Sequence, residues 1–212
     1  YAARSQQLAS AAAHAGIWER EITPITLADG SSVTKDDCPR PTTTVEKLAA
    51  LKPVFREDGR ITAGNACPLN DGAAAVVVMS DTRANELGIT PLARIVATGL
   101  SALNPQLMGL GPIEASRAAL MRAGMTMSDI DLVEINEAFA AQVIPSATHL
   151  GVCWEKLNVH GGAIALGHPI GASGARILVT LIHELQRQNK NKGCATLCIG
   201  GGMGIALCIE KI

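Results

Sequence analysis

One histidine stands inside a glycine-rich stretch in the second half of the chain. His168 is followed by Pro169 and belongs to the run Gly167–Gly174, which reads GHPIGASG. Glycines permit tight turns and let a ligand approach the backbone closely. The helix expected to begin near Ala172 would point its free N–H groups at this loop. A structural turn with an incidental histidine explains the same residues, and spacing alone leaves both interpretations open.

A cysteine and an asparagine lie at the ends of predicted strands. Cys198 comes near the end of an apolar stretch, just before three consecutive glycines that begin at Gly200. A buried strand cysteine is the simpler interpretation of that position. Asn136 joins a predicted strand to a predicted helix, where its amide could cap the helix or face a pocket. Sites in open α/β sheets form beyond the carboxyl ends of the strands, so both residues are candidates beside His168.

Two further candidates are cations in the first quarter of the chain. Arg40 and Lys47 lie in or beside a long irregular stretch rich in Asp, Ser and Pro. They could meet a phosphate group, although solvated side chains on a loop explain them equally well.

The elements that must position these residues follow from hydrophobic patterning and from glycine and proline. From residue 71 on, strands and helices alternate, which predicts an α/β fold with a five-stranded, mostly parallel sheet covered by helices on both faces. The link of three glycines predicts a final antiparallel hairpin. The expected strands are Ala73–Ser80, Leu92–Leu100, Asp131–Ile135, Cys194–Ile199 and Met203–Ile209. The expected helices are Thr82–Leu87, Pro112–Ala123, Glu137–Leu150, which Pro145 should bend or break, and Ala172–Gln188.

The first 70 residues carry fewer regular elements. We expect a helix over Tyr1–Gly16, a short strand over Glu21–Leu27, loop over Ala28–Thr44 and a short helix over Thr44–Leu51. The change from irregular sequence to alternating strand and helix patterns predicts a boundary near residue 70. We expect one unit over 1–70 and an α/β domain over 71–212.

Composition excludes several classes of protein. Of 212 residues 48% are hydrophobic and the formal net charge is −1, which argues against disorder and against a broad electrostatic affinity for nucleic acid or an anionic membrane. No apolar run approaches the ~18 residues of a membrane span. The six cysteines include no C-x-x-C pair, so we expect no metal site and free thiols in a reducing compartment: the cytoplasm, a mitochondrion or a peroxisome. Residues 1–16 lack the charged start and apolar core of a secretion signal.

Four motifs in order resemble the thiolases, the acyl-CoA:acetyl-CoA acyltransferases. They are Ala63–Ala75 (AGNACPLNDGAAA), Asn136–Ala140 (NEAFA), Asn158–Gly171 with its His-Gly-Gly and Gly-His-Pro segments, and Cys198–Gly204 (CIGGGMG). The resemblance runs along nearly the whole chain. It implies the C-terminal domain of the thiolase fold over 71–212, preceded over 1–70 by the second part of the loop region that covers coenzyme A.

The resemblance also implies a separate chemical role for each candidate residue. In a thiolase a nucleophilic cysteine attacks the keto carbon of a 3-ketoacyl-CoA, and none of the six cysteines matches its motif. The expected partner is therefore an N-terminal thiolase half that carries this cysteine, within a homo-oligomer of complete units. His168 resembles the base that activates the nucleophile and Cys198 the acid that protonates the departing enolate. Asn136, through a held water, and the backbone N–H of Gly200 resemble parts of two oxyanion holes.

Contacts to coenzyme A carry over residue by residue. Arg40 matches a cation at the nucleotide end of coenzyme A, and Lys47 could add a phosphate contact. Residues that match the pantetheine path are Phe55, Ala63, Cys67, Ala138 and Phe139. Cys67-Pro68 departs from the Ser-Gly of many members, which weakens the expectation of a polar contact there. Coenzyme A thioesters are substrates, and the resemblance implies neither a cofactor nor a metal.

Two other functions share parts of this pattern. A non-catalytic thiolase-like module would bind acyl-CoA or lipid without turnover, but it would not need His168, Cys198 and Asn136 together. A decarboxylating ketoacyl synthase shares the fold, but places a histidine where Cys198 stands.

Overall fold

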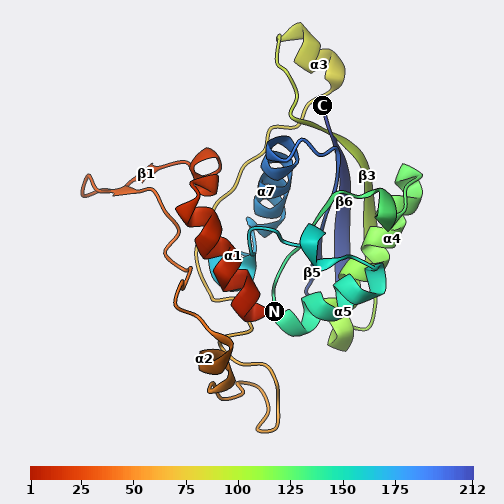
Figure 1. Ribbon diagram of the computed structural model, residues 1–212. Coiled ribbons are helices and arrows are strands. Elements are labelled where there is room, and N and C mark those ends of the chain that lie inside the picture. The colour runs from red at the N-terminus through yellow and green to blue at the C-terminus, as the bar shows by residue number, and fades with distance from the viewer.

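A four-stranded mixed sheet forms the centre of the computed structural model, which describes all 212 residues (Figure 1). The strands follow the order β3-β6-β5-β4. Their bounds are Ala93–Ala102 for β3, Leu132–Ile135 for β4, Lys192–Ile199 for β5 and Met203–Lys211 for β6. β4 and β5 are parallel, whereas β6 is antiparallel to both of its neighbours. Three strands therefore share one direction, and the last strand runs against them from a central position.

The predicted five-stranded, mostly parallel sheet is wrong in two respects. The apolar run Ala73–Ser80 forms no strand, because no other segment of the chain pairs with it. Strand propensity alone does not make a strand, since a ladder needs a partner. The hairpin predicted at the glycine link is confirmed, but it returns β6 between β5 and β3. Two of the three neighbouring pairs are consequently antiparallel.

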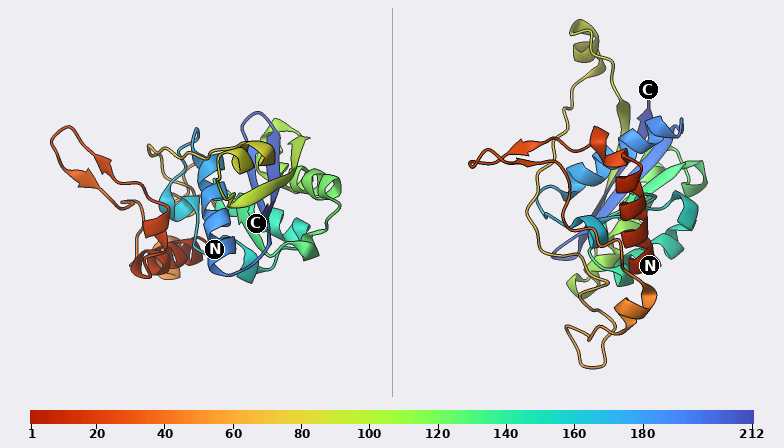
Figure 2. Two further views of the ribbon diagram at one scale, coloured as in Figure 1. Left: turned by 90° about the horizontal axis from the view of Figure 1, so that it is seen from above. Right: turned by 60° about the vertical axis from the view of Figure 1, so that its left-hand side comes forward.

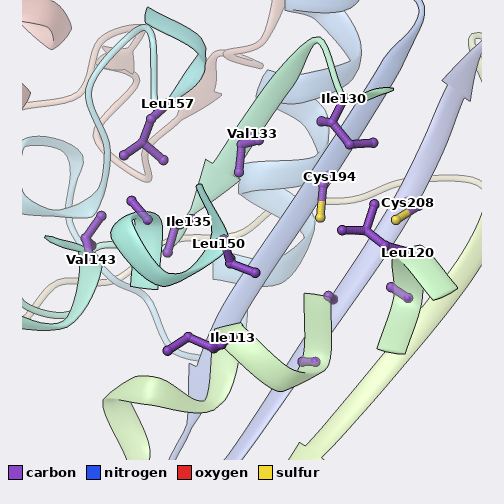
Figure 3. Close-up of a cluster of buried hydrophobic side chains, with 14 residues drawn as sticks. Ile113, Leu120, Ile130, Val133, Ile135, Val143, Leu150, Leu157, Cys194 and Cys208 are labelled. Carbon is purple, nitrogen blue, oxygen red and sulfur yellow. The ribbon is translucent and has the colours of Figure 1, made fainter. Parts of the chain in front are cut away.

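Helices cover both faces of the sheet, as predicted. α4 (Gly111–Ala123) and α5 (Ala140–Leu150) lie on one face, and α7 (Ser173–Arg187) lies on the other (Figure 1). The larger hydrophobic core joins α4 and α5 to β4, β5 and β6, and Cys194 and Cys208 face each other inside it (Figure 3). On the opposite face, the stripe Ile177, Leu181 and Leu185 packs against the sheet.

One glycine permits the close packing of β3 on α4. A Cβ atom at Gly99 would lie 2.0 Å from the carbonyl oxygen of Ala115 and 2.5 Å from the backbone nitrogen of Ala119. Any side chain at this position would push the helix off the strand.

All six predicted helices are present, with small differences in their bounds. α1 spans Ala2–His14, α2 spans Val45–Ala49 behind the N-cap Thr44, and α3 spans Asp81–Glu86 behind the N-cap Ser80. The structure adds α6 (Ala163–Leu166) and four short 3₁₀ turns at Ile17–Arg20, Pro105–Leu110, Met127–Asp129 and Trp154–Lys156. None of these helices combines the length and the apolar character needed to cross a membrane.

Pro145 does not break α5, which is one of the two effects that the sequence predicts. The helix runs without interruption from Ala140 to Leu150 around this residue. A proline in a helix interior costs about 3 kcal/mol. The buried side chains Val143, Ala147 and Leu150 anchor the helix to the larger core and offset that cost.

The segment predicted as strand and loop over residues 21–44 holds a small hairpin. β1 (Ile25–Thr26) pairs antiparallel with β2 (Ser32–Val33), so the strand is shorter than Glu21–Leu27 and its partner lies in the expected loop. The hairpin stands away from the sheet in every view (Figures 1 and 2).

The unpaired run Ala73–Ser80 predicts that this 212-residue chain associates with itself. Val77 and Val78 are 85% and 67% exposed, next to further exposed apolar side chains. Contiguous apolar surface beyond a few hundred Å² is unusual on a monomer. Sedimentation velocity should show dimers or larger species at micromolar concentration. The double variant Val77→Lys, Val78→Lys should shift the distribution toward monomer, and a stable monomer of the unmodified chain would contradict the prediction.

Candidate functional site

Asn136 and Cys198 lie at the carboxyl ends of two neighbouring parallel strands, and His168 contacts the first of them. Asn136 directly follows β4, and Cys198 is the last residue but one of β5. The two strands are parallel, and the Asn136 backbone N–H donates to the Thr196 carbonyl at 3.0 Å. His168 enters from the loop between α6 and α7, with its Nε2 3.3 Å from the Asn136 side-chain nitrogen. The contact lies beyond the carboxyl end of β4, and the site at this position stays a prediction.

Hydrogen bonds fix the tautomer of His168. The Ser173 hydroxyl donates its proton to the Pro169 carbonyl at 3.0 Å, so it accepts from His168 Nδ1, which lies 2.5 Å away. Nδ1 therefore carries the ring proton. Nε2 is left as an acceptor that faces the Asn136 amide. This arrangement presents the basic nitrogen of the ring to the edge of the sheet.

The surroundings of His168 favour the neutral ring. Burial lowers its pKa below the ordinary value of 6.5, and the positive charge of Arg176 lowers it further. An imidazole that is neutral at pH 7 can accept a proton, which is the property required of a general base.

Cys198 lies in a protected position. Cys198 is only 6% exposed. Burial raises the pKa of its thiol above the ordinary value of 9.0, and the neighbouring Cys67 raises it slightly further. The thiol is therefore protonated near neutral pH and is suited to donate a proton rather than to attack as a thiolate. Gly200 follows in an exposed turn between β5 and β6.

Two buried amide oxygens accept no hydrogen bond from the protein near His168. One is Asn136 Oδ1, in a residue that is completely buried. The other is Asn70 Oδ1, whose side chain packs on Gly167: a Cβ atom there would lie 2.4 Å from the Asn70 amide, and Gly167 has a φ of +96°. Both oxygens are available to an O–H or N–H donor.

Four of the residues matched to the pantetheine path gather beside Asn136. Phe139 forms an isolated bridge with Ala66, and the Cys67 N–H donates to the Ala138 carbonyl at 3.0 Å. The rings of Phe55 and Phe139 are 6.2 Å apart at an angle of 73°. Phe55 is 70% exposed, so one side of this aromatic pair faces solvent. Ala63 is exposed in the adjoining turn.

The predicted cations lie apart from this group. The Lys47 ammonium donates to the Thr42 carbonyl at 2.7 Å, and the Arg40 backbone N–H donates to Gln6 Oε1 at 2.7 Å. Neither side chain forms a salt bridge, and both residues are exposed. Their predicted contact with a phosphate stays a prediction.

Sequence reasoning missed the residues that hold the site in place. Ser173 orients His168, and Glu137 and Asn158 are both completely buried next to the site. A serine at the start of a helix is common in any protein, so no local signal marks Ser173. His160, in the His-Gly-Gly segment, is buried, and its Nε2 lies 2.7 Å from Glu184 Oε2.

The tautomer of His168 can be tested by ¹⁵N NMR. The ring should carry its proton on Nδ1, and its titration midpoint should lie below 6.5 because burial and Arg176 disfavour the charged form. Ser173→Ala removes the acceptor of Nδ1 and should mix the tautomers. The exposed His149 serves as an internal control and should not respond. A midpoint at or above 6.5, or an unchanged spectrum in Ser173→Ala, would contradict the assignment.

The chain matches two family models. Residues 89–211 match the model described as "Thiolase, C-terminal domain", and residues 1–82 match "Thiolase, N-terminal domain". The expectation of a chain confined to the C-terminal part, with a separate N-terminal half as its partner, is corrected by the second match. The boundary near residue 70 stays a prediction.

Curated and structural relatives cover the entire chain. Acetyl-CoA acetyltransferases of Thiocystis violacea and Syntrophomonas wolfei are 51% and 54% identical to it, over 100% and 99% of this chain and 55% and 54% of theirs. The crystal structure of the Bacillus anthracis acetyl-CoA acetyltransferase is 50% identical with a TM-score of 0.97, over all of this chain and 54% of that one.

A second solved structure is human mitochondrial 3-ketoacyl-CoA thiolase in complex with CoA, which is 44% identical with a TM-score of 0.94, over all of this chain and 53% of that one. The chain thus spans about half the length of the relatives that it matches. On the evidence of both domain models and of these relatives, the chain belongs to the thiolase family.

Proposed function

We propose that this chain contributes acid–base groups to acyl transfer between an acyl-CoA and acetyl-CoA, as thiolysis of a 3-ketoacyl-CoA or as the reverse Claisen condensation. The observation that carries the proposal is the contact of His168 Nε2 with Asn136 at the edge where β5 presents Cys198. The names of the relatives, acetyl-CoA acetyltransferase and 3-ketoacyl-CoA thiolase, supply the reaction class.

His168 acts as the base of the first step. Nε2 takes the proton of a cysteine thiol, and the sulfur attacks the keto carbon of the substrate. The bond between that carbon and the α-carbon breaks, and the acyl group stays on sulfur. The electron pair of the broken bond leaves with acetyl-CoA, which departs as an enolate. Cys198 then gives its proton to the α-carbon. The burial that keeps the Cys198 thiol protonated supports this role.

Oxygen atoms that gain negative charge need fixed donors. His168 becomes such a donor once Nε2 is protonated. Asn136 contributes through a water that donates a hydrogen bond to its Oδ1, and the absence of a protein donor to this oxygen supports that function. The backbone N–H of Gly200, in the turn that follows Cys198, is the donor proposed for the second oxyanion.

Coenzyme A lies over the surface made by the loop region. Phe55, Ala63, Cys67, Ala138 and Phe139 line the pantetheine arm, supported by the aromatic pair and the Cys67–Ala138 hydrogen bond. Arg40 and Lys47 approach the nucleotide phosphates. The exposed position of both cations leaves them free to bind an anion.

The attacking cysteine is proposed to lie outside residues 1–212. Cys194 and Cys208 are buried in strands, and Cys67 and Cys198 have pKa values raised mainly by burial. Cys67 and Cys198 are therefore poor nucleophiles near neutral pH, and burial keeps Cys194 and Cys208 out of reach of a substrate. The complete enzyme is proposed to form a homo-oligomer in a reducing compartment.

The 212 residues alone should not catalyse thiolysis of acetoacetyl-CoA, because they lack an activated nucleophile. The reaction with coenzyme A can be followed spectrophotometrically on the purified chain. Turnover above about 1 s⁻¹, which is within the ordinary enzymatic range, would contradict the placement of the nucleophile.

Cys198→Ser and His168→Asn should fail at different steps of the complete enzyme. Serine is a far weaker acid, so Cys198→Ser should slow proton exchange at the acetyl α-carbon by roughly 10²–10⁴-fold. It should still accept radiolabelled acetyl groups from acetyl-CoA, since that step moves no α-proton.

His168→Asn removes the base and should prevent labelling. Labelling lost in Cys198→Ser but kept in His168→Asn would reverse the two roles. Full turnover in both variants would place the catalytic site elsewhere. An unmodified enzyme that binds acyl-CoA without turnover would favour the non-catalytic module.

A further inference from the structure

A buried carboxylate without a cation lies directly behind the site. Glu137 is completely buried, and no Lys, Arg or His forms a salt bridge with it. Four neutral donors surround it instead. Oε1 accepts from the Tyr1 hydroxyl at 2.7 Å and from the Asn158 amide at 3.1 Å. Oε2 accepts from the Ser5 hydroxyl at 2.6 Å and from the Ile164 backbone N–H at 3.0 Å.

These donors come from two segments that the sequence separates widely. Tyr1 and Ser5 belong to the start of α1, whereas Asn158 and Ile164 belong to the loop that leads through α6 to His168. Burial and the neighbouring Glu137 raise the pKa of the Tyr1 hydroxyl, which keeps it a donor at neutral pH. One carboxylate therefore joins α1, the turn after β4 and the histidine loop.

The histidine loop packs on the carboxylate without a gap. A Cβ atom at Gly162 would lie 2.5 Å from the Glu137 carboxyl carbon and 2.8 Å from either oxygen. The Gly162 N–H donates to Ser5 Oγ at 3.1 Å, so the loop is bonded to a donor of the carboxylate as well. A shift of the carboxylate would move this loop.

The same network fixes the backbone on the other side of Asn136. The Asn158 amide accepts from the Ile135 N–H at 2.8 Å and donates to the Ile135 carbonyl at 2.8 Å. Asn136 thus lies between two residues that are both held through Asn158, while its own side chain reaches His168.

We propose that Glu137 is a positioning residue for the reaction: its carboxylate holds Asn136 and the loop carrying His168 in the relative placement that their contact requires. This inference rests on the proposed function for its kinetic consequence, but the placement itself can be measured without substrate.

The decisive variant is Glu137→Gln in the intact enzyme. Glutamine has nearly the same shape but replaces one acceptor oxygen with an NH₂ group that faces other donors. A misplacement of about 1 Å can cost roughly 10²-fold in rate, so kcat for thiolysis of acetoacetyl-CoA should fall by about 10²-fold. KM for coenzyme A should change less than about 3-fold, because the pantetheine residues do not bond to the carboxylate. The ¹⁵N spectrum of His168 without substrate should lose its single-tautomer pattern.

Leu185→Ala provides a control matched for loss of stability. Leu185 is completely buried in α7, about 18 Å along the helix axis from Ser173 at 1.5 Å per residue. It should lower the melting temperature while kcat and the His168 spectrum stay as in the unmodified enzyme. Equal losses of kcat in Leu185→Ala and Glu137→Gln, or an unchanged His168 spectrum in Glu137→Gln, would overturn the proposal.

Tyr1→Phe keeps the inference testable if Glu137→Gln does not fold. It removes one donor and keeps the ring, which packs against Trp154 at 5.7 Å. A smaller loss of kcat, about 5-fold, is expected, together with a partial change of the His168 spectrum; no change in either would overturn the proposal. An unmodified enzyme without thiolysis activity would refute the proposed function alone, since the spectra of both variants would still decide the placement.

Discussion

The arrangement of the site depends on satisfying one buried negative charge with neutral donors. Glu137 carries no paired cation, so four hydrogen bonds from neutral donors compensate for the burial of its charge. That requirement brings α1 against the loop that carries His168 and fixes the turn that carries Asn136. Residues more than 130 positions apart in the sequence are thereby held in one geometry.

Two other buried glutamates of the same domain are accommodated differently. Glu184 accepts from His160 and Arg187; burial raises its pKa, but these hydrogen bonds outweigh burial and bring the pKa to about 2. Glu134 has only Arg176, at 3.8 Å, and burial raises its pKa to about 8. The number and distance of the donors, more than burial itself, decide whether a carboxyl group at this sheet remains charged.

The sequence predicts the residues of the candidate site better than it predicts the residues that hold them in place. Glycines and strand ends mark His168 and Cys198, and alternating patterns predict four of the strands and both helical layers, because each of these signals is local. The partners of Glu137 are not local, and a buried glutamate in a motif looks like a surface residue until its donors are known. The run Ala73–Ser80 has the composition of a buried strand, but pairing is a property of two segments and cannot be read from one. The central place of β6 depends on the whole sheet.

That central place bears on the order in which the domain can form during synthesis. β6 occupies residues 203–211 and lies between β3 and β5, so β3 has no neighbour in the sheet until residues 203–211 have left the ribosome. Until then α4 can pack on β3 and α5, but the apolar residues that later face β6 stay uncovered. Closing the sheet requires β3 to be joined across about 100 residues of intervening chain, a long-range contact of the kind that slows folding. The nascent domain therefore passes through a stage in which β3 presents an open strand edge.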